Sequence, residues 1–432
     1  MKFYNINNRR KRVSLKEAIL RSVVNVGDLY MPVSIPLMPD TFIKNLKGRA
    51  LNEIAAETTY AVFGEDIPPD IIYRIVNEAL TFEIPLKRLK DNLYVLELFH
   101  GPTLAFKDVG ARFMAGLFEF ITSEENHEIN VLAATSGDTG SAVANAFYNK
   151  SGIRVIILYP EGKVSLIQEK QLTTMGGNII AIAVEGTFDD CQRLVKLSFA
   201  DRDLNKRLTL TSANSINFAR LFPQSFYYFH AYAQLEDNSG SLVFSVPSGN
   251  FGNLTAGLIA KRMGLPASRF IASTNINRSV PDYLNSGVFE PKPTIQTITN
   301  AMDVGNPGNF PRILELYNYD IGRLRSDLTG YWFNDLDTMK AMASLMDEYS
   351  YQADPHGAVA FLGLTDFMRN TDCTGIFLET AHPVKFADVV SRATGKDIAI
   401  PAAISGLMNL ESKTIKMGNS FKELKEYLLS SW

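Results

Sequence analysis

Short β-branched runs alternate with amphipathic segments along most of the chain, from about residue 94 onward. Residues 94–98 and 130–134 have the length and composition of buried strands, and residues 109–120 and 141–148 carry helical spacing. Strands that alternate with helices pair in parallel and are covered on both faces. The pattern therefore predicts an α/β fold with a largely parallel sheet. Further strands are predicted at residues 154–159, 179–184, 208–211, 242–246, 269–273 and 375–379, and a further helix at residues 164–175.

Residues 1–93 follow a different pattern, in which helical spacing dominates. A helix is predicted to begin after Ser14 and to extend to Val24, with Ser14 and Glu17 at the two positions of a capping box. Helical spacing returns twice before residue 81. We therefore predict a mainly helical N-terminal domain over residues 1–93, which ends in a charged connector at residues 87–92.

Length, charge and cysteine content narrow the class of protein. A chain of 432 residues is long enough for two or three domains, each with its own apolar core. The formal net charge is −3 and no long run of one sign occurs, so neither nucleic acid nor a membrane surface is an expected partner. Cys191 and Cys373 are too few for a disulfide framework and offer no metal-ligand spacing. With no export signal or membrane-spanning run, we expect a cytoplasmic enzyme that acts on a small molecule and holds no metal.

One lysine lies in a setting that suits covalent chemistry. Lys107 follows an apolar, small-residue turn and stands where the predicted helix begins. A helix N-terminus disfavours a cation, and the neighbouring Leu104 and Phe106 add desolvation, so this amine should lose proton affinity. A lysine is prepared for Schiff-base formation in this way. The alternative is an ordinary lysine whose side chain extends to the surface from a helix start.

A hydroxyl-rich turn follows the strand at residues 130–134, at the edge of the sheet where ligands bind in such folds. Thr135, Ser136 and Thr139 supply hydroxyls beside Asp138, and the turn leads into a helix N-terminus. Such a turn suits a carboxylate or a phosphate. A plain helix cap explains the same residues about equally well.

A second turn, after the strand at residues 242–246, has the composition of a phosphate cup. It is rich in backbone N–H groups and poor in side-chain bulk, and it leads into another helix. It lacks the ending of a P-loop and the spacing of a dinucleotide fingerprint, and a tight strand-to-helix turn remains the alternative. Its residues are Gly249, Asn250, Phe251, Gly252 and Asn253.

Two further groups of polar residues complete the candidate site. Ser215, Asn217 and Arg220 stand among apolar neighbours, and an arginine in such a place usually meets a carboxylate or phosphate. A buried pair with an aspartate of the same domain is nearly as good an explanation. Thr380 places a hydroxyl at the end of a predicted strand. A buried lysine, a phosphate cup and a polar strand end are what a pyridoxal phosphate (PLP) site requires.

The stretch His-Gly-Pro-Thr-Leu-Ala-Phe-Lys-Asp, which ends at Asp108, resembles the corresponding segment of the threonine synthases of the longer bacterial and fungal form. The resemblance extends over essentially the whole chain, from the helix after Ser14 to the Thr-Ala-His-Pro segment that begins at Thr380. It implies the architecture of fold-type II PLP enzymes, with two largely parallel, open twisted sheets flanked by helices. It also implies a PLP-lysine and substrate-loop domain at residues 94–230 and a cofactor-cup domain at residues 231–432.

The resemblance also implies a role for each candidate residue. Lys107 matches the lysine that bonds to PLP, and Thr380 matches the hydroxyl residue that faces the pyridine nitrogen. Asp138 falls where shorter relatives often have an asparagine near the cofactor's phenolic oxygen. The cup residues 249–253 match the loop around the cofactor phosphate. Thr135, Ser136 and Thr139 match the loop for the substrate carboxylate, and Ser215, Asn217 and Arg220 match the site for the substrate phosphate.

The activity implied is that of a carbon–oxygen lyase, which converts O-phosphohomoserine and water into threonine and phosphate in the last step of threonine biosynthesis. We expect a monomer or a homodimer. A serine or threonine dehydratase of the same cofactor class is the nearest alternative. A catalytically inactive sensor with the same fold is the alternative from another class.

Overall fold

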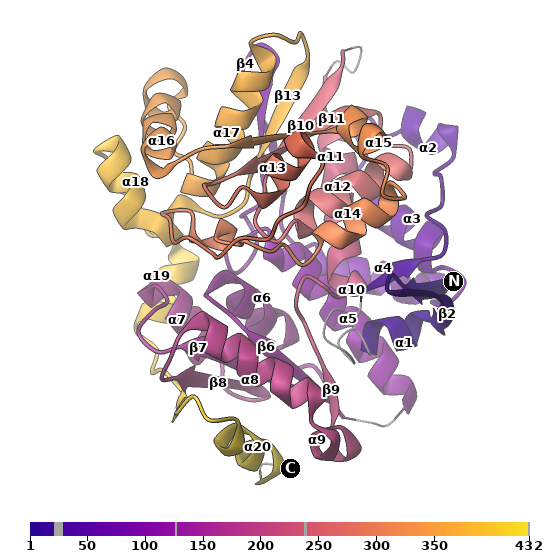
Figure 1. Ribbon diagram of the computed structural model, residues 1–432, viewed down its shortest axis with the longest axis vertical. Helices are drawn as coiled ribbons and strands as arrows, with labels where there is room; N and C mark the ends of the chain where they lie inside the picture. The colour runs from indigo at the N-terminus through magenta and orange to yellow at the C-terminus, as the bar shows by residue number, and fades with distance from the viewer. Residues whose placement is uncertain (21–28, 126–127, 237–239, 431–432) are drawn as a thin grey trace.

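The computed structural model describes residues 1–20, 29–125, 128–236 and 240–430 (Figure 1). Two parallel-rich sheets, each covered by helices, form its two halves, and the α/β architecture predicted from the sequence is confirmed. In Figure 1 the larger sheet occupies the upper half and the smaller sheet the lower half. Within the described residues, no helix combines the length and the apolar character needed to cross a membrane.

The larger sheet has the strand order β12-β11-β10-β13-β5-β4 within the described residues, and only β4 runs antiparallel to its neighbour. Its central strands are buried on both faces, which is why they read as continuous apolar runs in the sequence. The strands are β4 (Leu86–Lys90), β5 (Leu93–Glu97), β10 (Leu242–Pro247), β11 (Ala267–Thr274), β12 (Leu328–Trp332) and β13 (Thr374–Glu379).

The smaller sheet has the order β14-β8-β7-β6-β9 within the described residues, and all of its pairings are parallel. Its last strand, β14, comes from the C-terminal region and pairs with β8, so the chain returns to this half after it has completed the other. The strands are β6 (Ile129–Ala134), β7 (Ile153–Pro160), β8 (Ile179–Val184), β9 (Thr209–Thr211) and β14 (Ile415–Met417).

The N-terminal region differs from the prediction at its start. The chain opens with an antiparallel hairpin, β1 (Lys2–Asn5) and β2 (Asn8–Ser14), and β3 (Tyr30–Pro32) pairs with β1. All but one of the seven residues of β2 are exposed, so the sequence shows no alternation there that would indicate a strand. The cap predicted at Ser14 is present, because its hydroxyl accepts a hydrogen bond of 3.1 Å from the Glu17 amide. The predicted extension to Val24 lies outside the described residues.

Residues 87–92, predicted as a connector, belong mostly to strand β4, which pairs with β5 at the edge of the larger sheet. This edge strand reads Leu-Lys-Arg-Leu-Lys, and charged side chains of this kind are typical of a protected sheet edge. The same charges conceal the strand in the sequence. The divisions at residues 93 and 230 stay predictions, because each sheet contains strands from both sides of the second one.

Helices surround both sheets. In the described residues they are α1 (Leu15–Leu20), α2 (Asp40–Lys44), α3 (Leu51–Phe63), α4 (Pro69–Ala79), α5 (Lys107–Glu125), α6 (Asp138–Phe147), α7 (Leu166–Thr173), α8 (Phe188–Ala200), α9 (Arg202–Arg207), α10 (Phe218–Leu221), α11 (Phe226–Gln234), α12 (Gly252–Arg262), α13 (Ser279–Ser286), α14 (Phe310–Leu316), α15 (Ile321–Asp327), α16 (Asp335–Tyr349), α17 (Pro355–Met368), α18 (Ala387–Thr394), α19 (Ala402–Met408) and α20 (Phe421–Ser430), with 3₁₀ turns η1 (Phe222–Ser225), η2 (Asn300–Met302) and η3 (Pro383–Phe386).

Candidate active site

Lys107 is the first residue of α5, as predicted, and it lies beside the carboxyl end of β13. The turn before it is held there by two backbone hydrogen bonds, from the Phe106 amide to the Thr380 carbonyl (2.9 Å) and from the His382 amide to the Leu104 carbonyl (3.0 Å). Lys107 and Thr380 are 273 residues apart in the sequence. The fold therefore brings the candidate lysine and the candidate hydroxyl to the same edge of the larger sheet.

The amine of Lys107 has a lowered proton affinity. The pKa of Lys107 is lowered to about 8, mainly by desolvation; the charges of Arg220 and Lys385 act in the same direction, and the charge of Asp138 opposes them. Its Nζ lies 4.0 Å from the Asp138 carboxylate. About one amine in ten is therefore unprotonated at pH 7. Desolvation is the cause that the sequence predicted.

Asp138 is the first residue of α6 and lies almost completely buried between cations. Its Oδ1 accepts hydrogen bonds from Lys385 Nζ (2.7 Å) and Gln168 Nε2 (2.9 Å). Burial alone would raise the pKa of Asp138, but Lys385 and Lys107 hold it well below its usual range. Gly137 permits this packing: its φ is +142°, and a Cβ there would lie 2.4 Å from the Gln168 amide carbon.

The hydroxyl-rich turn lies next to Asp138. The hydroxyl of Thr135 is engaged within the turn, where it accepts hydrogen bonds from the amides of Gly137 (3.0 Å) and Gly140 (2.8 Å). Ser136 is exposed and Thr139 is half-buried. Thr135 therefore shapes the turn, and the other two side chains are accessible to a ligand.

The predicted cup forms the entry to α12, and its last residue presents an unused donor. The hydroxyls of Tyr227 and Tyr228 both donate to Asn253 Oδ1, at 2.7 and 2.6 Å. This fixes the amide so that Nδ2, which is also buried, has no hydrogen-bond partner among the described residues. An unpaired buried donor is costly, so it indicates a missing acceptor. No side chain caps α12, and Phe251 before it adopts a left-handed φ of +59°, so the first amides of the helix face the turn.

Asn250 joins the cup to two neighbouring loops. Its Nδ2 donates to Ser215 Oγ (2.8 Å), and its Oδ1 accepts from the Gly308 amide. Asn309 completes the junction by donating to the carbonyl of Asn250 (3.1 Å). On the other side of the cup, a Cβ on Gly249 would lie 2.6 Å from the Ala301 carbonyl oxygen, so only glycine allows that approach.

Arg220 is a buried cation without a counter-ion. Its side chain is 3% exposed, and its guanidinium donates to the carbonyl of Ala213. Burial lowers the pKa of Arg220 to about 10, opposed by the charge of Asp108, and within the described residues it forms no ion pair. The alternative considered from the sequence, a pair with an aspartate, is therefore not what the structure contains. Asn217 instead holds the loop, since its amide caps α10 and donates to the carbonyl of Ile19 (2.9 Å).

Three residues of this region were not singled out from the sequence. They are Lys385, Gln168 and Arg312, and all three are buried. Arg312 donates to Asn309 Oδ1 (2.6 Å) and to the carbonyl of Ile216, so it supports the junction of loops. The contacts of Lys385 and Gln168 with Asp138 join segments far apart in the sequence, so the local sequence does not reveal them.

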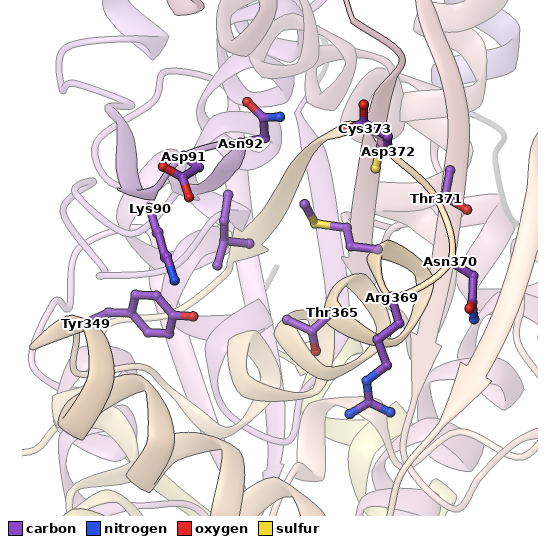
Figure 2. Close-up of a pocket in the computed structure, with 12 residues that line it drawn as sticks. Lys90, Asp91, Asn92, Tyr349, Thr365, Arg369, Asn370, Thr371, Asp372 and Cys373 are labelled. Carbon is purple, nitrogen blue, oxygen red and sulfur yellow. The ribbon is translucent and has the colours of Figure 1, made fainter.

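A separate cavity of about 650 Å³ lies at the other end of the larger sheet (Figure 2). It is lined by residues at or near the amino ends of β5 and β13, among them Asn92 and Cys373. Lys107 and Thr380 are at the carboxyl ends of the same strands or beyond. The cavity therefore lies away from the candidate active site.

Comparisons with known proteins agree along the whole chain. Residues 2–80 match the family model described as threonine synthase N terminus, residues 79–374 match that of PLP-dependent enzymes, and residues 357–428 match that of the threonine synthase C-terminal region. The threonine synthase of Haemophilus influenzae is 44% identical over 435 residues, which cover 100% of both chains. The chain belongs to the threonine synthase family.

Solved threonine synthase structures have the same fold. The enzyme from Escherichia coli superposes with a TM-score of 0.93 at 41% identity and 100% coverage of both chains. A PLP-bound threonine synthase from Brucella melitensis gives a TM-score of 0.92 at 33% identity, with 99% of this chain and 98% of that chain covered. This threonine synthase family member is a PLP-dependent lyase of fold type II, as the sequence resemblance implied.

The residues present fit PLP. An aldehyde needs an amine, a ring nitrogen needs a hydrogen-bonding group and a phosphate needs N–H donors. The structure offers a partly buried lysine with a lowered pKa, the adjoining Thr380 and a cup with an unpaired amide donor. The unpaired Asn253 Nδ2 is the observation that the cofactor phosphate explains directly. No competing carboxylate is among the residues of the cup itself.

Proposed function

We propose that the chain converts O-phosphohomoserine and water into threonine and phosphate, the last step of threonine biosynthesis. The observation that carries this proposal is the buried Arg220 guanidinium, which has no ion-pair partner among the described residues. A buried cation without a counter-ion is unfavourable unless a ligand supplies the negative charge. A phosphorylated substrate supplies a phosphate in addition to its carboxylate, whereas serine or threonine supplies only the carboxylate, for which the turn at Ser136 and Thr139 is the proposed site. Arg312, which is also buried without an ion pair among the described residues, is held instead by Asn309 Oδ1 and the carbonyls of Tyr30 and Ile216.

The cofactor would be held by Lys107, by the cup at residues 249–253 and by Thr380. When bound, PLP supplies an electron-withdrawing ring that stabilises negative charge at the α-carbon of the substrate. A hydroxyl at the ring nitrogen, in place of a carboxylate, leaves that nitrogen largely unprotonated. Orientation and hydrogen bonds from the protein must then contribute more to catalysis.

Lys107 carries the proton transfers. Its amine takes the proton from the substrate α-carbon, for which it must itself be unprotonated. Its lowered pKa makes this form available near neutral pH. The buried surroundings that lower the pKa also exclude water from the reacting atoms until the final addition at the β-carbon.

The remaining residues bind the two ends of the substrate. Ser136 and Thr139, with backbone amides of their turn, would hold the carboxylate. Arg220 and Ser215 would hold the phosphate and keep the leaving group in place as its bond to the γ-carbon breaks. Asn217 and Thr135 fix the backbone of these two loops.

We also infer a cytoplasmic enzyme that acts as a monomer or homodimer and needs neither nucleic acid nor membrane. The low cysteine content and the mild net charge support this inference.

Release of phosphate from O-phosphohomoserine by the purified holoenzyme, with threonine identified as the product, tests the proposal. We expect stoichiometric phosphate and threonine with the native chain. An exposed lysine such as Lys163, changed to alanine, is the matched control for the inactive Lys107→Ala variant. Formation of a 2-oxo acid from serine or threonine, without turnover of O-phosphohomoserine, would identify a dehydratase. A normal cofactor spectrum without turnover of any of these substrates would identify a sensor.

A further inference from the structure

Lys385 has no role in the reaction proposed above, yet its side chain is buried and paired with specific groups. It lies on η3, directly after the strand that leads to Thr380, and its side chain is completely buried. Its Nζ contacts two oxygens at 2.7 Å, Asp138 Oδ1 and the carbonyl of Thr103. A buried ammonium is costly even when it is paired, so apolar packing would serve a purely structural position at least as well.

The two oxygens of Asp138 face different partners. Lys385 and Gln168 both occupy Oδ1, at 2.7 and 2.9 Å. Oδ2 faces Lys107 at 4.0 Å, which is beyond hydrogen-bond distance. Asp138 is therefore held through Oδ1 by Lys385 and Gln168, and its contact with Lys107 is a long ion pair without a hydrogen bond.

We propose that Lys385 is a positioning residue that holds Asp138 away from Lys107, so that the amine of Lys107 can lose its proton and react with the cofactor aldehyde. The proposal rests on the proposed function in one respect, the assignment of Lys107 as the cofactor lysine. Without Lys385, Asp138 would have Lys107 as its nearest cation and would pair with it. A lysine held in such a pair stays protonated and does not attack a carbonyl carbon.

No other described charged group near Lys107 and Lys385 can take the place of Lys385 or Asp138. Lys107 is faced by Asp138 on α6, Arg220 on α10 and Lys385 on η3. Lys385 is faced by Asp138, by Asp108 on α5 and by the ring of His382 before η3. Asp108 is hydrogen-bonded to the hydroxyl and amide of Thr103, at 2.6 and 2.9 Å, and is not free to replace Asp138.

The rate of cofactor uptake tests the proposal. The cofactor-free full-length chain is mixed with PLP between pH 6 and pH 10, and the rise of visible absorbance is followed. The unprotonated amine nitrogen attacks the aldehyde carbon, a C=N bond forms and the aldehyde oxygen leaves as water. The rate therefore follows the unprotonated fraction of Lys107, with an inflection near pH 8 in the native chain.

Lys385→Met should move the inflection upward by about one pH unit, which makes uptake at pH 7 about tenfold slower. Asp138→Asn should move it downward, because it removes the one anion that faces Lys107 among the described residues and leaves both cations. Opposite directions distinguish a charge effect from general damage to the site, which would slow uptake at every pH. In the Asp138→Asn background, Lys385→Met should shift the inflection by less than it does in the native chain.

An unchanged inflection in Lys385→Met, or a shift in the same direction in both single variants, overturns the proposal. Lys163→Met, at an exposed lysine, is the matched control and should behave as the native chain. If circular dichroism shows that Lys385→Met is unfolded, Lys385→Gln and Asp138→Asn decide in the same way. Lys107→Ala separates the two ideas: visible absorbance that persists in that variant refutes the cofactor-lysine assignment, whereas its loss leaves the Lys385 result to stand alone.

Discussion

Two clusters of charged groups lie near the carboxyl edge of the larger sheet. They differ in how the charge of their members is offset. The cation cluster consists of Lys107, Arg220 and Lys385, on the side of the candidate active site. The carboxyl cluster consists of Glu97, Asp354 and Glu379, and Glu97 and Glu379 end the neighbouring strands β5 and β13. Every side chain of the carboxyl cluster is at most 3% exposed.

The carboxyl cluster is balanced from within the chain. Glu97 receives Lys87 at 2.9 Å, His100 at 2.7 Å and the Tyr351 hydroxyl at 3.1 Å. Burial alone would raise the pKa of Glu97, but the hydrogen bonds of His100 and Lys87 lower it. Glu379 has no such cation, and desolvation, with the charge of Asp354, raises its pKa well above the usual range. A carboxyl group can thus be neutralised by a pair or by a proton.

Arg220 cannot be neutralised by a change of protonation as Glu379 is, because a guanidinium keeps its proton at any physiological pH. Asp138 serves Lys385 and Lys107, and Arg220 remains without an ion pair in the described part of the chain. The comparison shows two ways in which a buried charge is offset. Glu97 is paired with a cation of the chain and Glu379 keeps a proton, whereas Arg220 has no ion pair among the described residues, and we propose that a ligand supplies its counter-charge.

The largest effect should come from Lys107→Ala. This change removes the amine that we assign to the bond with the cofactor aldehyde, and the other amine of the cluster, Lys385, is held by Asp138 and the carbonyl of Thr103. The visible absorbance and the turnover should therefore both be lost. The fold should persist, because among the described residues the side chain makes no hydrogen bond, and its contact with Asp138 is 4.0 Å long. Absorbance spectra before and after borohydride, with circular dichroism as the folding control, check this. Residual turnover above a few per cent would contradict it.

Arg220→Ala should raise the KM for O-phosphohomoserine by about 10- to 150-fold, because a hydrogen bond to a charged group contributes roughly 1.5–3 kcal/mol. Cofactor affinity should change much less. Steady-state kinetics and equilibrium titration with PLP measure the two effects separately. Arg323→Ala, at an exposed arginine paired only with Asp320, is the matched control. Equal losses in both measurements would mean that Arg220 supports the whole site.

Asn253→Ala should weaken PLP binding about tenfold, because it removes the amide donor that now lacks a partner. Tyr228→Phe is the matched control, since Tyr227 still donates to Asn253 Oδ1 and keeps the amide in place. Equilibrium binding of PLP by absorbance measures both. Similar losses in the two variants would place the phosphate elsewhere in the cup.

The two glutamates of the carboxyl cluster should respond to pH in opposite directions. The folded chain holds a proton on Glu379 above the unfolded pKa near 4.5, so this group stabilises at low pH and its contribution is lost as pH rises. Glu97 has a lowered pKa, so it stabilises above that pH and its contribution is lost as pH falls.

Glu379→Gln should therefore gain stability relative to the native chain as pH rises above 4.5. The gain is about 1.4 kcal/mol for each pH unit over which only the folded chain keeps the proton. Glu97→Gln should lose a constant amount of stability above pH 4.5 and should recover as pH falls below 4.5. Urea unfolding from pH 3 to pH 8 gives both trends. Parallel trends in the two variants would remove the distinction between them.

Local patterns in the sequence predicted the parts of the fold that depend on neighbouring residues. The buried strands of both sheets, the start of α5 at Lys107 and the glycine turn before α12 all have a composition that defines them locally. The hairpin of β1 and β2 and the edge strand β4 were missed or taken for a connector, because exposed charges hide their alternation.

In the candidate site, too, the residues in local motifs were predicted, and those placed by distant contacts were not. Lys107, the cup and Thr380 stand in recognisable turns, and the structure brings Lys107 and Thr380 to one edge. Lys385 and Gln168 were not predicted, since each reaches Asp138 from a segment far away in the chain. Whether Arg220 would meet an aspartate or remain unpaired also depended on tertiary packing, and the sequence left both possibilities open.

The contact between Asp138 and Lys385 spans the two halves of the molecule. Asp138 follows β6 of the smaller sheet, whereas Lys385 follows β13 of the larger one, and Lys107 is tied by its turn to the same end of β13. A rotation of one half against the other would stretch this ion pair and alter the separation between Asp138 and Lys107. The fraction of Lys107 that is unprotonated would thus depend on how closely the two halves of the molecule pack against each other.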